Sequence, residues 1–313
     1  MNRSSKGRSI LYLVISTADG ADDDRLKTAL GELAAQDPSV SINTQREGTL
    51  HNLEGSCESD LKSICDRLRD EYHLAINVSP SKAIFLETVR GQAEAEGKYI
   101  RQTGSSGNYG HCKLRIEPSE PGEGYEFIND IRGDVVPNEY INPINQGVQD
   151  AMELGILAGF PVVDVKVTLY DGSYHEADSN EMAFKCAASI AFNEAAKKAN
   201  PVLLEPMMAI EIIEVPERLA AAIRTEIAAH RGRVEREETK GGWSEFKAVV
   251  PLSEILASGS RLLAEFPMEF TGYEAVRIDG SSDENGSGVT ANKPNRPRPS
   301  RRSEMTRPDR EDV

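Results

Sequence analysis

The sequence predicts an α+β protein in which two ferredoxin-like βαββαβ domains flank a middle domain of a different kind. Two observations carry this prediction. Apolar runs of strand length alternate with stretches of helical periodicity. The order strand, helix, strand, strand, helix, strand occurs once on each side of the middle part of the chain. The 313 residues are enough for two or three domains of ordinary size.

The first unit, residues 8–80, opens with the apolar run Ile10–Ile15. A helix follows at Asp22–Ala35, since leucines at positions 26, 30 and 33 share one face and three aspartates stand at its N-terminus, where the helix dipole favours them. The remaining elements are two strands joined by a turn, a second helix and a closing strand, at Ser39–Thr44, Thr49–Leu53, Ser59–Tyr72 and Leu74–Val78.

The third unit, residues 206–278, has the same order without visible sequence repetition. Pro216 in the first turn of a helix follows the strand Met207–Val215, and Gly241-Gly242 predicts a hairpin turn. The other elements are expected at Arg233–Thr239, Trp243–Val250, Pro251–Leu263 and Pro267–Tyr273. Residues 279–313 are rich in Ser, Asn, Pro and Arg and are expected to be a disordered tail. An RNA-seeking arm is the alternative, because residues 291–302 hold five basic side chains and no acid.

The middle unit, residues 82–205, contains longer helices. They are expected at Pro137–Leu154 and Asp178–Lys198, with Asp178 as the N-cap of the second. Strands are expected at Ile84–Arg90, Lys98–Gln102, Cys112–Ile116, Tyr125–Asp130 and Val162–Tyr170.

A glycine-rich segment of this middle unit, Gly104–His111, predicts contact with a polyanion. It lies between two strand-like runs, and the stretch from Lys98 to Arg115 holds four basic residues and no acidic one in a chain of net charge −15. A second short turn, Gly172–His175, has similar chemistry. Two such polar loops on one domain favour RNA over a small metabolite as the ligand.

Composition excludes several other classes of protein. A net charge of −15 argues against a protein that coats nucleic acid non-specifically. No run approaches the roughly 20 apolar residues of a membrane span, and no signal peptide is evident, so a cytoplasmic protein without membrane contact is expected. The four cysteines show no C-x-x-C spacing and no neighbouring His cluster, so we expect reduced thiols and no metal or other cofactor.

The middle unit resembles domain IV of elongation factor G, the ribosomal translocase. The resemblance is carried by short blocks that occur in order along the chain: Glu96–Lys98, Gly104–His111, Gly124–Asp130, Leu157–Asp164, Gly172–His175, Asp178-Ser179, Met182–Lys185 and Pro201–Pro206. The flanking units are similar to domains III and V of that family, on Ala29–Ser39 and Pro251–Glu254. The resemblance extends to about residue 278.

The resemblance implies an elongated middle domain that imitates a tRNA anticodon arm and whose tip loops enter the decoding centre of the small ribosomal subunit. In such loops, glycines let backbone N–H groups approach phosphates, tyrosines stack on bases, and histidines donate hydrogen bonds to phosphate or 2′-OH groups. The candidate RNA-binding residues are Gly104, Ser105, Ser106, Gly107, Asn108, Tyr109, Gly110, His111, Gly172, Ser173, Tyr174 and His175.

The family's GTPase and β-barrel domains have no counterpart in this sequence. No G-x-x-x-x-G-K-[ST] phosphate loop occurs, so intrinsic GTP hydrolysis is not expected, and the chain is not predicted to be an enzyme. The predicted function is ribosome binding by a truncated factor of this family. Two alternatives stay open: the C-terminal half of a split factor that needs a separate GTPase-bearing protein, and a repurposed binding protein that acts elsewhere.

An acid–base or metal cluster is a further possibility, which the sequence does not favour. His111, His175, Asp178 and Glu181 are the residues that could form it, but no nucleophile stands near them in the sequence.

Overall fold

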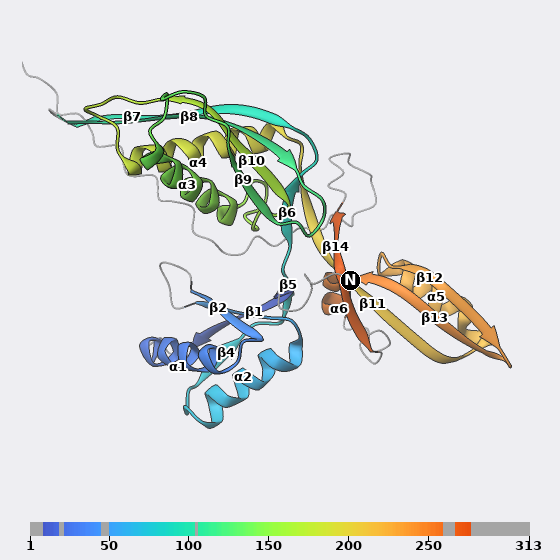
Figure 1. Ribbon diagram of the computed structural model, residues 1–313. Coiled ribbons are helices and arrows are strands. Elements are labelled where there is room, and N and C mark those ends of the chain that lie inside the picture. The colour runs from blue at the N-terminus through green and yellow to red at the C-terminus, as the bar shows by residue number, and fades with distance from the viewer. Residues whose placement is uncertain (1–8, 19–21, 45–49, 104–105, 259–266, 277–313) are drawn as a thin grey trace, which may run out of the picture.

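The computed structural model describes residues 9–18, 22–44, 50–103, 106–258 and 267–276 (Figure 1). These residues form three separate β-sheets, each with its own helices, and confirm the predicted α+β fold. No helix in the described part of the chain is long and apolar enough to cross a membrane.

The first domain is a ferredoxin-like unit with the predicted element order. Its four main strands pair antiparallel in the order β2-β3-β1-β4, and the apolar faces of both helices, including Leu26 and Leu61, are buried. The elements are β1 (Leu11–Thr17), α1 (Asp23–Gln36), β2 (Val40–Thr44), β3 (His51–Gly55), α2 (Glu58–Asp70) and β4 (Ile76–Val78).

Two short strands carry the chain from the first domain to the next. β5 (Lys82–Ala83) pairs with β1 and therefore still belongs to the first sheet. β6 (Leu86–Val89) pairs instead with the first four residues of β11 (Pro201–Pro216), a long strand that leads from the middle domain into the third. The crossover is thus bonded to both neighbours rather than being a loose linker.

The middle domain is a four-stranded sheet in the order β7-β8-β10-β9, with α3 and α4 on one side (Figure 1). β9 and β10 are parallel, so α3 is the crossover between them, and α4 packs directly on β7 and β8. The elements are β7 (Ala93–Thr103), β8 (Ser106–Pro118), β9 (Tyr125–Asn129), η1 (Asn138–Tyr140), α3 (Ile141–Leu154), β10 (Val165–Ser173) and α4 (Glu181–Lys198).

The predicted start of α4 is wrong by three residues. The N-cap is Asn180, whose side-chain oxygen accepts a hydrogen bond from the Ala183 N–H at 2.9 Å. Asp178 lies before the helix, and its carboxylate accepts a hydrogen bond from the Gly107 N–H at 3.2 Å. Asp178 therefore joins the loop before α4 to strand β8.

The third domain repeats the ferredoxin-like order β12-β13-β11-β14. Its elements are β11, η2 (Glu217–Leu219), α5 (Ala220–Ala229), β12 (Arg233–Lys240), β13 (Trp243–Pro251), α6 (Leu252–Ser258) and β14 (Met268–Val276). The predicted helix Pro251–Leu263 is described only as far as Ser258. The predicted tail, residues 279–313, lies outside the described residues.

Buried apolar side chains form two cores. One is shared by the first and third domains and includes Phe85, Phe160 and Met208. The other lies within the middle domain, where Phe184 and Phe192 of α4 are fully buried against the sheet. The first and third domains therefore contact each other through a continuous apolar core, and we call the two together the base.

Candidate nucleic-acid interface

The fold brings together the two polar segments that the sequence singled out. β8 and β10 are antiparallel neighbours, with His111 opposite Ser173, and the Tyr109 N–H donates to the Asp178 carbonyl at 2.7 Å. Both segments therefore lie at one end of the middle domain, at the far end of the β7–β8 hairpin (Figure 1). We call this end the tip. Gly104 and Ser105 lie outside the described residues.

Most of the candidate residues are in strands, which corrects the expectation of two loops. Ser106–His111 form the first half of β8, and their ladder with β7 runs from Thr103 opposite Ser106 down the whole hairpin. Gly172 and Ser173 end β10. Of the described candidate residues, Tyr174 and His175 alone lie outside a strand. They directly follow β10, and both are exposed.

The glycines at the tip permit close packing within the protein. A Cβ on Gly110 would lie 2.3 Å from the Ala183 carbonyl oxygen of α4, and one on Gly107 would lie 2.7 Å from the Asp178 carboxylate. At Gly172 a Cβ would meet the His111 carbonyl oxygen at 2.6 Å. The sequence suggested that these glycines let the backbone approach phosphate. In the structure, they are required because a side chain would collide with neighbouring protein atoms.

The Ser173 hydroxyl joins two aromatic side chains of β8. Its oxygen lies 2.7 Å from the Tyr109 hydroxyl and 2.7 Å from His111 Nδ1. The Tyr109 ring also meets the His175 ring edge to face, with centroids 4.4 Å apart. Tyr109, His111 and Ser173 therefore form a hydrogen-bonded cluster, against which the exposed His175 packs.

The surroundings of His111 disfavour its protonated form. Burial, and secondly the charge of Lys98, lower the pKa of its imidazole below the ordinary value. Its Nε2 is buried without a hydrogen-bond partner, although a Glu96 carboxylate oxygen lies 3.6 Å away. Glu96 favours the protonated ring and so offsets part of the effect of burial on the pKa of His111.

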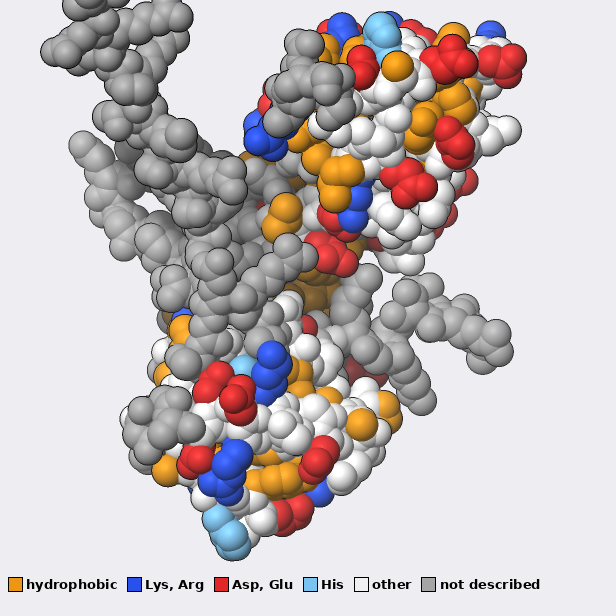
Figure 2. Space-filling model, turned by 90° about the vertical axis from the view of Figure 1, so that its left-hand side faces the viewer, with side chains coloured by type: hydrophobic (Ala, Val, Ile, Leu, Met, Phe, Trp, Pro, Cys, Tyr) orange, Lys and Arg blue, Asp and Glu red, His pale blue; other side chains and the backbone are white. Residues whose placement is uncertain are grey.

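The charge of the basic stretch is largely neutralised by acidic residues of β7 and β10. Lys113 pairs with Asp171 at 2.7 Å, Arg115 with Glu94 at 2.8 Å, and Lys98 with Glu96 at 3.5 Å. Of the four basic residues, Arg101 alone has no ion pair with any residue that the structure describes. Figure 2 shows acidic and basic side chains interspersed on the visible face, without a large field of one sign.

Two exposed apolar residues near the tip were missed by the sequence interpretation. Ile100 is 68% exposed on β7 and Met182 is 65% exposed in the first turn of α4. Ile100 could have been found from period-two alternation, because Glu94, Glu96 and Lys98 precede it on the same face. Met182 lies two residues after the N-cap Asn180. It was missed because the helix had been expected to begin earlier, at Asp178.

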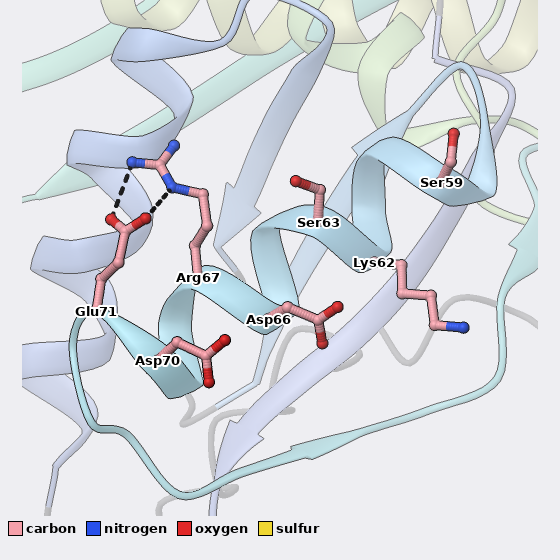
Figure 3. Close-up of a pocket in the computed structure, with 7 residues that line it drawn as sticks. All are labelled: Ser59, Lys62, Ser63, Asp66, Arg67, Asp70 and Glu71. Carbon is pink, nitrogen blue, oxygen red and sulfur yellow. Dashed lines mark hydrogen bonds and ion pairs between the residues drawn. The ribbon is translucent and has the colours of Figure 1, made fainter.

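The acid–base or metal alternative gains no support from the geometry. Asp178 is engaged by the Gly107 N–H, and the described residues contain no group of three or more His, Cys, Asp or Glu side chains that could hold a metal ion. A depression on the first domain is lined by side chains of a single helix, α2, and its end, among which Arg67 and Glu71 pair with each other (Figure 3). These side chains form a solvated helix surface without a buried reactive group.

Comparison with protein families identifies three consecutive domains of elongation factor G along the chain. Residues 8–80 match the model of elongation factor G domain III, residues 82–200 that of domain IV, and residues 202–283 that of the C-terminus. The chain belongs to the elongation factor G family.

A solved structure has a similar fold over most of this chain. The chain is similar to a crystal structure of a protein from Thermus thermophilus, with 34% sequence identity and a TM-score of 0.64. The match covers 89% of this chain and 42% of the other. The chain therefore spans less than half the length of that relative.

Proposed function

We propose that this protein binds the ribosome through the tip of its middle domain, against RNA of the decoding centre, and that it does not itself hydrolyse GTP. The observation that carries the proposal is the meeting of residues 106–111 and 172–175 at one end of an extended domain. Family membership supports ribosome binding as the general role.

The candidate residues divide into contacts and supports. Tyr174 and His175 are exposed, as is Arg101 of β7, which has no ion pair with a described residue. These three are proposed to touch RNA by stacking, hydrogen bonding and phosphate contact. Tyr109, His111 and Ser173 hold one another by hydrogen bonds and are proposed to position them. Gly107, Asn108, Gly110 and Gly172 keep the backbone in place beneath, and Asn108 accepts a hydrogen bond from Asn180 at 2.7 Å.

Cosedimentation with 70S ribosomes at low and moderate salt tests the proposal. The double variant Tyr174→Ala/Arg101→Ala is expected to bind about tenfold more weakly, because one stacked base contributes about 1–3 kcal/mol and one phosphate contact is lost as well. The matched control is Tyr72→Ala/Arg69→Ala on the first domain, which removes the same two residue types far from the tip. Undiminished binding by the tip variant, or equal loss in the control, would refute tip-mediated binding.

A second candidate function follows from the 42% coverage of the longer relative. The chain is then the C-terminal part of a factor whose GTPase module is supplied separately. Adding GTP alone should leave binding unchanged under both candidates. Adding a purified GTPase and β-barrel module with GTP should tighten binding only under the second.

A further inference from the structure

Glu87, in the crossover strand β6, is a fully buried carboxylate without a cationic partner. Its two oxygens accept hydrogen bonds from five consecutive backbone N–H groups, those of residues 156–160, at up to 3.1 Å. No lysine, arginine or histidine in the described part of the chain pairs with it. A buried charge needs compensation, and here the backbone dipoles alone supply it.

The loop after α3 is shaped to make this cradle. Gly155 and Gly159 have φ of +74° and +86°, and a Cβ on Gly155 would lie 2.4 Å from the Phe160 carbonyl oxygen. These conformations curl the chain so that its successive N–H groups face one point. Two backbone bonds flank the cradle: the Glu87 N–H donates to the Pro161 carbonyl at 2.9 Å, and the Val163 N–H donates to the Glu87 carbonyl at 2.8 Å.

The cradle lies at the junction of the two cores. Phe160 packs on Phe85 with ring centroids 5.4 Å apart, within the core shared by the first and third domains. Two residues further on, Val162 belongs to the core of the middle domain, as does Met152 before the loop. Glu87 thus binds a loop of the middle domain, and this loop places the Phe160 side chain in the core of the base.

We propose that Glu87 is a positioning residue that fixes the orientation of the middle domain relative to the base. Its carboxylate accepts five hydrogen bonds at a junction that the chain crosses twice, through the four-residue strand β6 and through its ladder partner β11. Hydrogen bonds to a charged acceptor are stronger than neutral ones, so this cluster outweighs the two flanking backbone bonds. The proposal concerns the chain by itself and holds whether or not the tip binds RNA.

The native cysteines provide a direct measurement of this orientation. Cys57 in the first domain and Cys186 on α4 are half-buried, whereas Cys65 and Cys112 are buried. Nitroxide labels on Cys57 and Cys186 report the distance between base and middle domain by pulsed electron resonance. The unaltered chain is expected to give one narrow distance distribution.

Glu87→Gln is expected to abolish that single narrow distribution while circular dichroism shows folded domains. The amide has the same size, but it offers one acceptor oxygen and turns two N–H donors toward backbone N–H donors. Gly159→Ala provides a second variant that leaves Glu87 intact, because a side chain at φ +86° strains the cradle from the loop side. This variant is expected to broaden the distribution of distances between the two labels. If Glu87→Gln does not fold, Gly159→Ala tests the proposal in its place.

The matched control is Glu205→Gln in the third domain. Glu205 is similarly buried, but it has a cationic partner: the side chain of Arg231, also in the third domain, compensates it through two hydrogen bonds of 2.9 Å. This variant is expected to lower stability and to keep the distance distribution narrow. A narrow distribution in folded Glu87→Gln or in Gly159→Ala, or equal broadening in Glu205→Gln, would overturn the proposal.

Discussion

The two faces of the middle sheet are built by opposite means, although the same strands supply both. On the covered face, Gly97 and Gly110 let the backbone of α4 approach so closely that a Cβ would lie 2.0 Å and 2.3 Å from helix carbonyl oxygens. On the open face, cross-strand charge pairs lead up to the Tyr109, His111 and Ser173 cluster. Along β8, residues such as Gly110 that face α4 are therefore constrained by packing against the helix. Residues such as Tyr109 and Lys113 that face the opposite way are constrained by side chains of the adjacent strands.

This comparison teaches how to interpret glycine in such a segment. Six of the eight buried residues of α4 are alanines, so helix and sheet meet almost backbone to backbone. A glycine there is required by the helix, whatever ligand the open face takes. The functional information lies in the residues between the glycines.

The largest expected effect is on the covered face. Gly110→Ala should lower the free energy of unfolding by about 3 kcal/mol, because the new methyl group meets backbone atoms that cannot rotate away. Chemical denaturation monitored by circular dichroism measures it. In Gly31→Ala, at an exposed helix site with no atom within 4 Å of the new Cβ, stability should rise by up to about 1 kcal/mol. If Gly110→Ala left the free energy of unfolding unchanged, the covered face would tolerate added volume. The proposed difference between the covered and the open face would then be wrong.

An intermediate effect is expected on the open face as pH falls. The folded state holds the pKa of His111 below its ordinary value of 6.5, so above that pH the imidazole is neutral in both states and its contribution to stability is complete. Below it, the unfolded chain takes up the proton first, and stability is lost until the pH passes the folded pKa. Lys98 and Lys113 oppose protonation, whereas Glu96 favours it.

Thermal unfolding of the wild type and His111→Gln between about pH 5 and 8 measures this contribution. The variant should show a weaker loss of stability on acidification below the ordinary imidazole pKa. Parallel pH profiles for the two proteins would mean that burial does not depress the pKa of His111.

The smallest effect is expected from the charge pairs. Lys113→Ala should change the free energy of unfolding far less than Gly110→Ala does, because the Lys113–Asp171 pair is partly exposed to solvent. A double-mutant cycle with Asp171→Ala isolates the energy of the pair, and raising the salt concentration should reduce that energy further. A coupling energy as large as the cost of Gly110→Ala would give the open face a stabilising role comparable to that of the covered face.

Much of the fold was predictable from periodicity. The element order of both ferredoxin-like domains is confirmed, because helices such as α1 and α2 have an apolar stripe and strands such as β1 an apolar run. The charged strand β12 was predicted from the hairpin turn Gly241-Gly242 that follows it. The domain boundaries 8–80, 82–205 and 206–278 stay predictions. The length of β7 and β8 was underestimated, because strands that pack under an alanine helix are rich in small residues, which sequence rules assign to turns.

The contact of the candidate residues with RNA stays a prediction, but their arrangement can be compared with the sequence interpretation. Sequence reasoning selected both segments that meet at the tip. The sequence did not reveal that Glu94, Glu96 and Asp171 pair with the basic stretch, because these acidic residues lie outside it, in β7 and β10. Glu87 was unpredictable for the same reason, since the N–H groups that bind it lie about 70 residues further along the chain.

The strand β11 has a consequence for how proteins of this shape can vary in length. Its sixteen residues form ladders with three strands at once, β6, β13 and β14. One inserted residue would turn every following side chain to the opposite face in all the ladders beyond it. Natural length variation should therefore accumulate at the Gly241-Gly242 turn and spare residues 201–212. A collection of related sequences would show this as a gap-free block flanked by regions that have gained and lost residues.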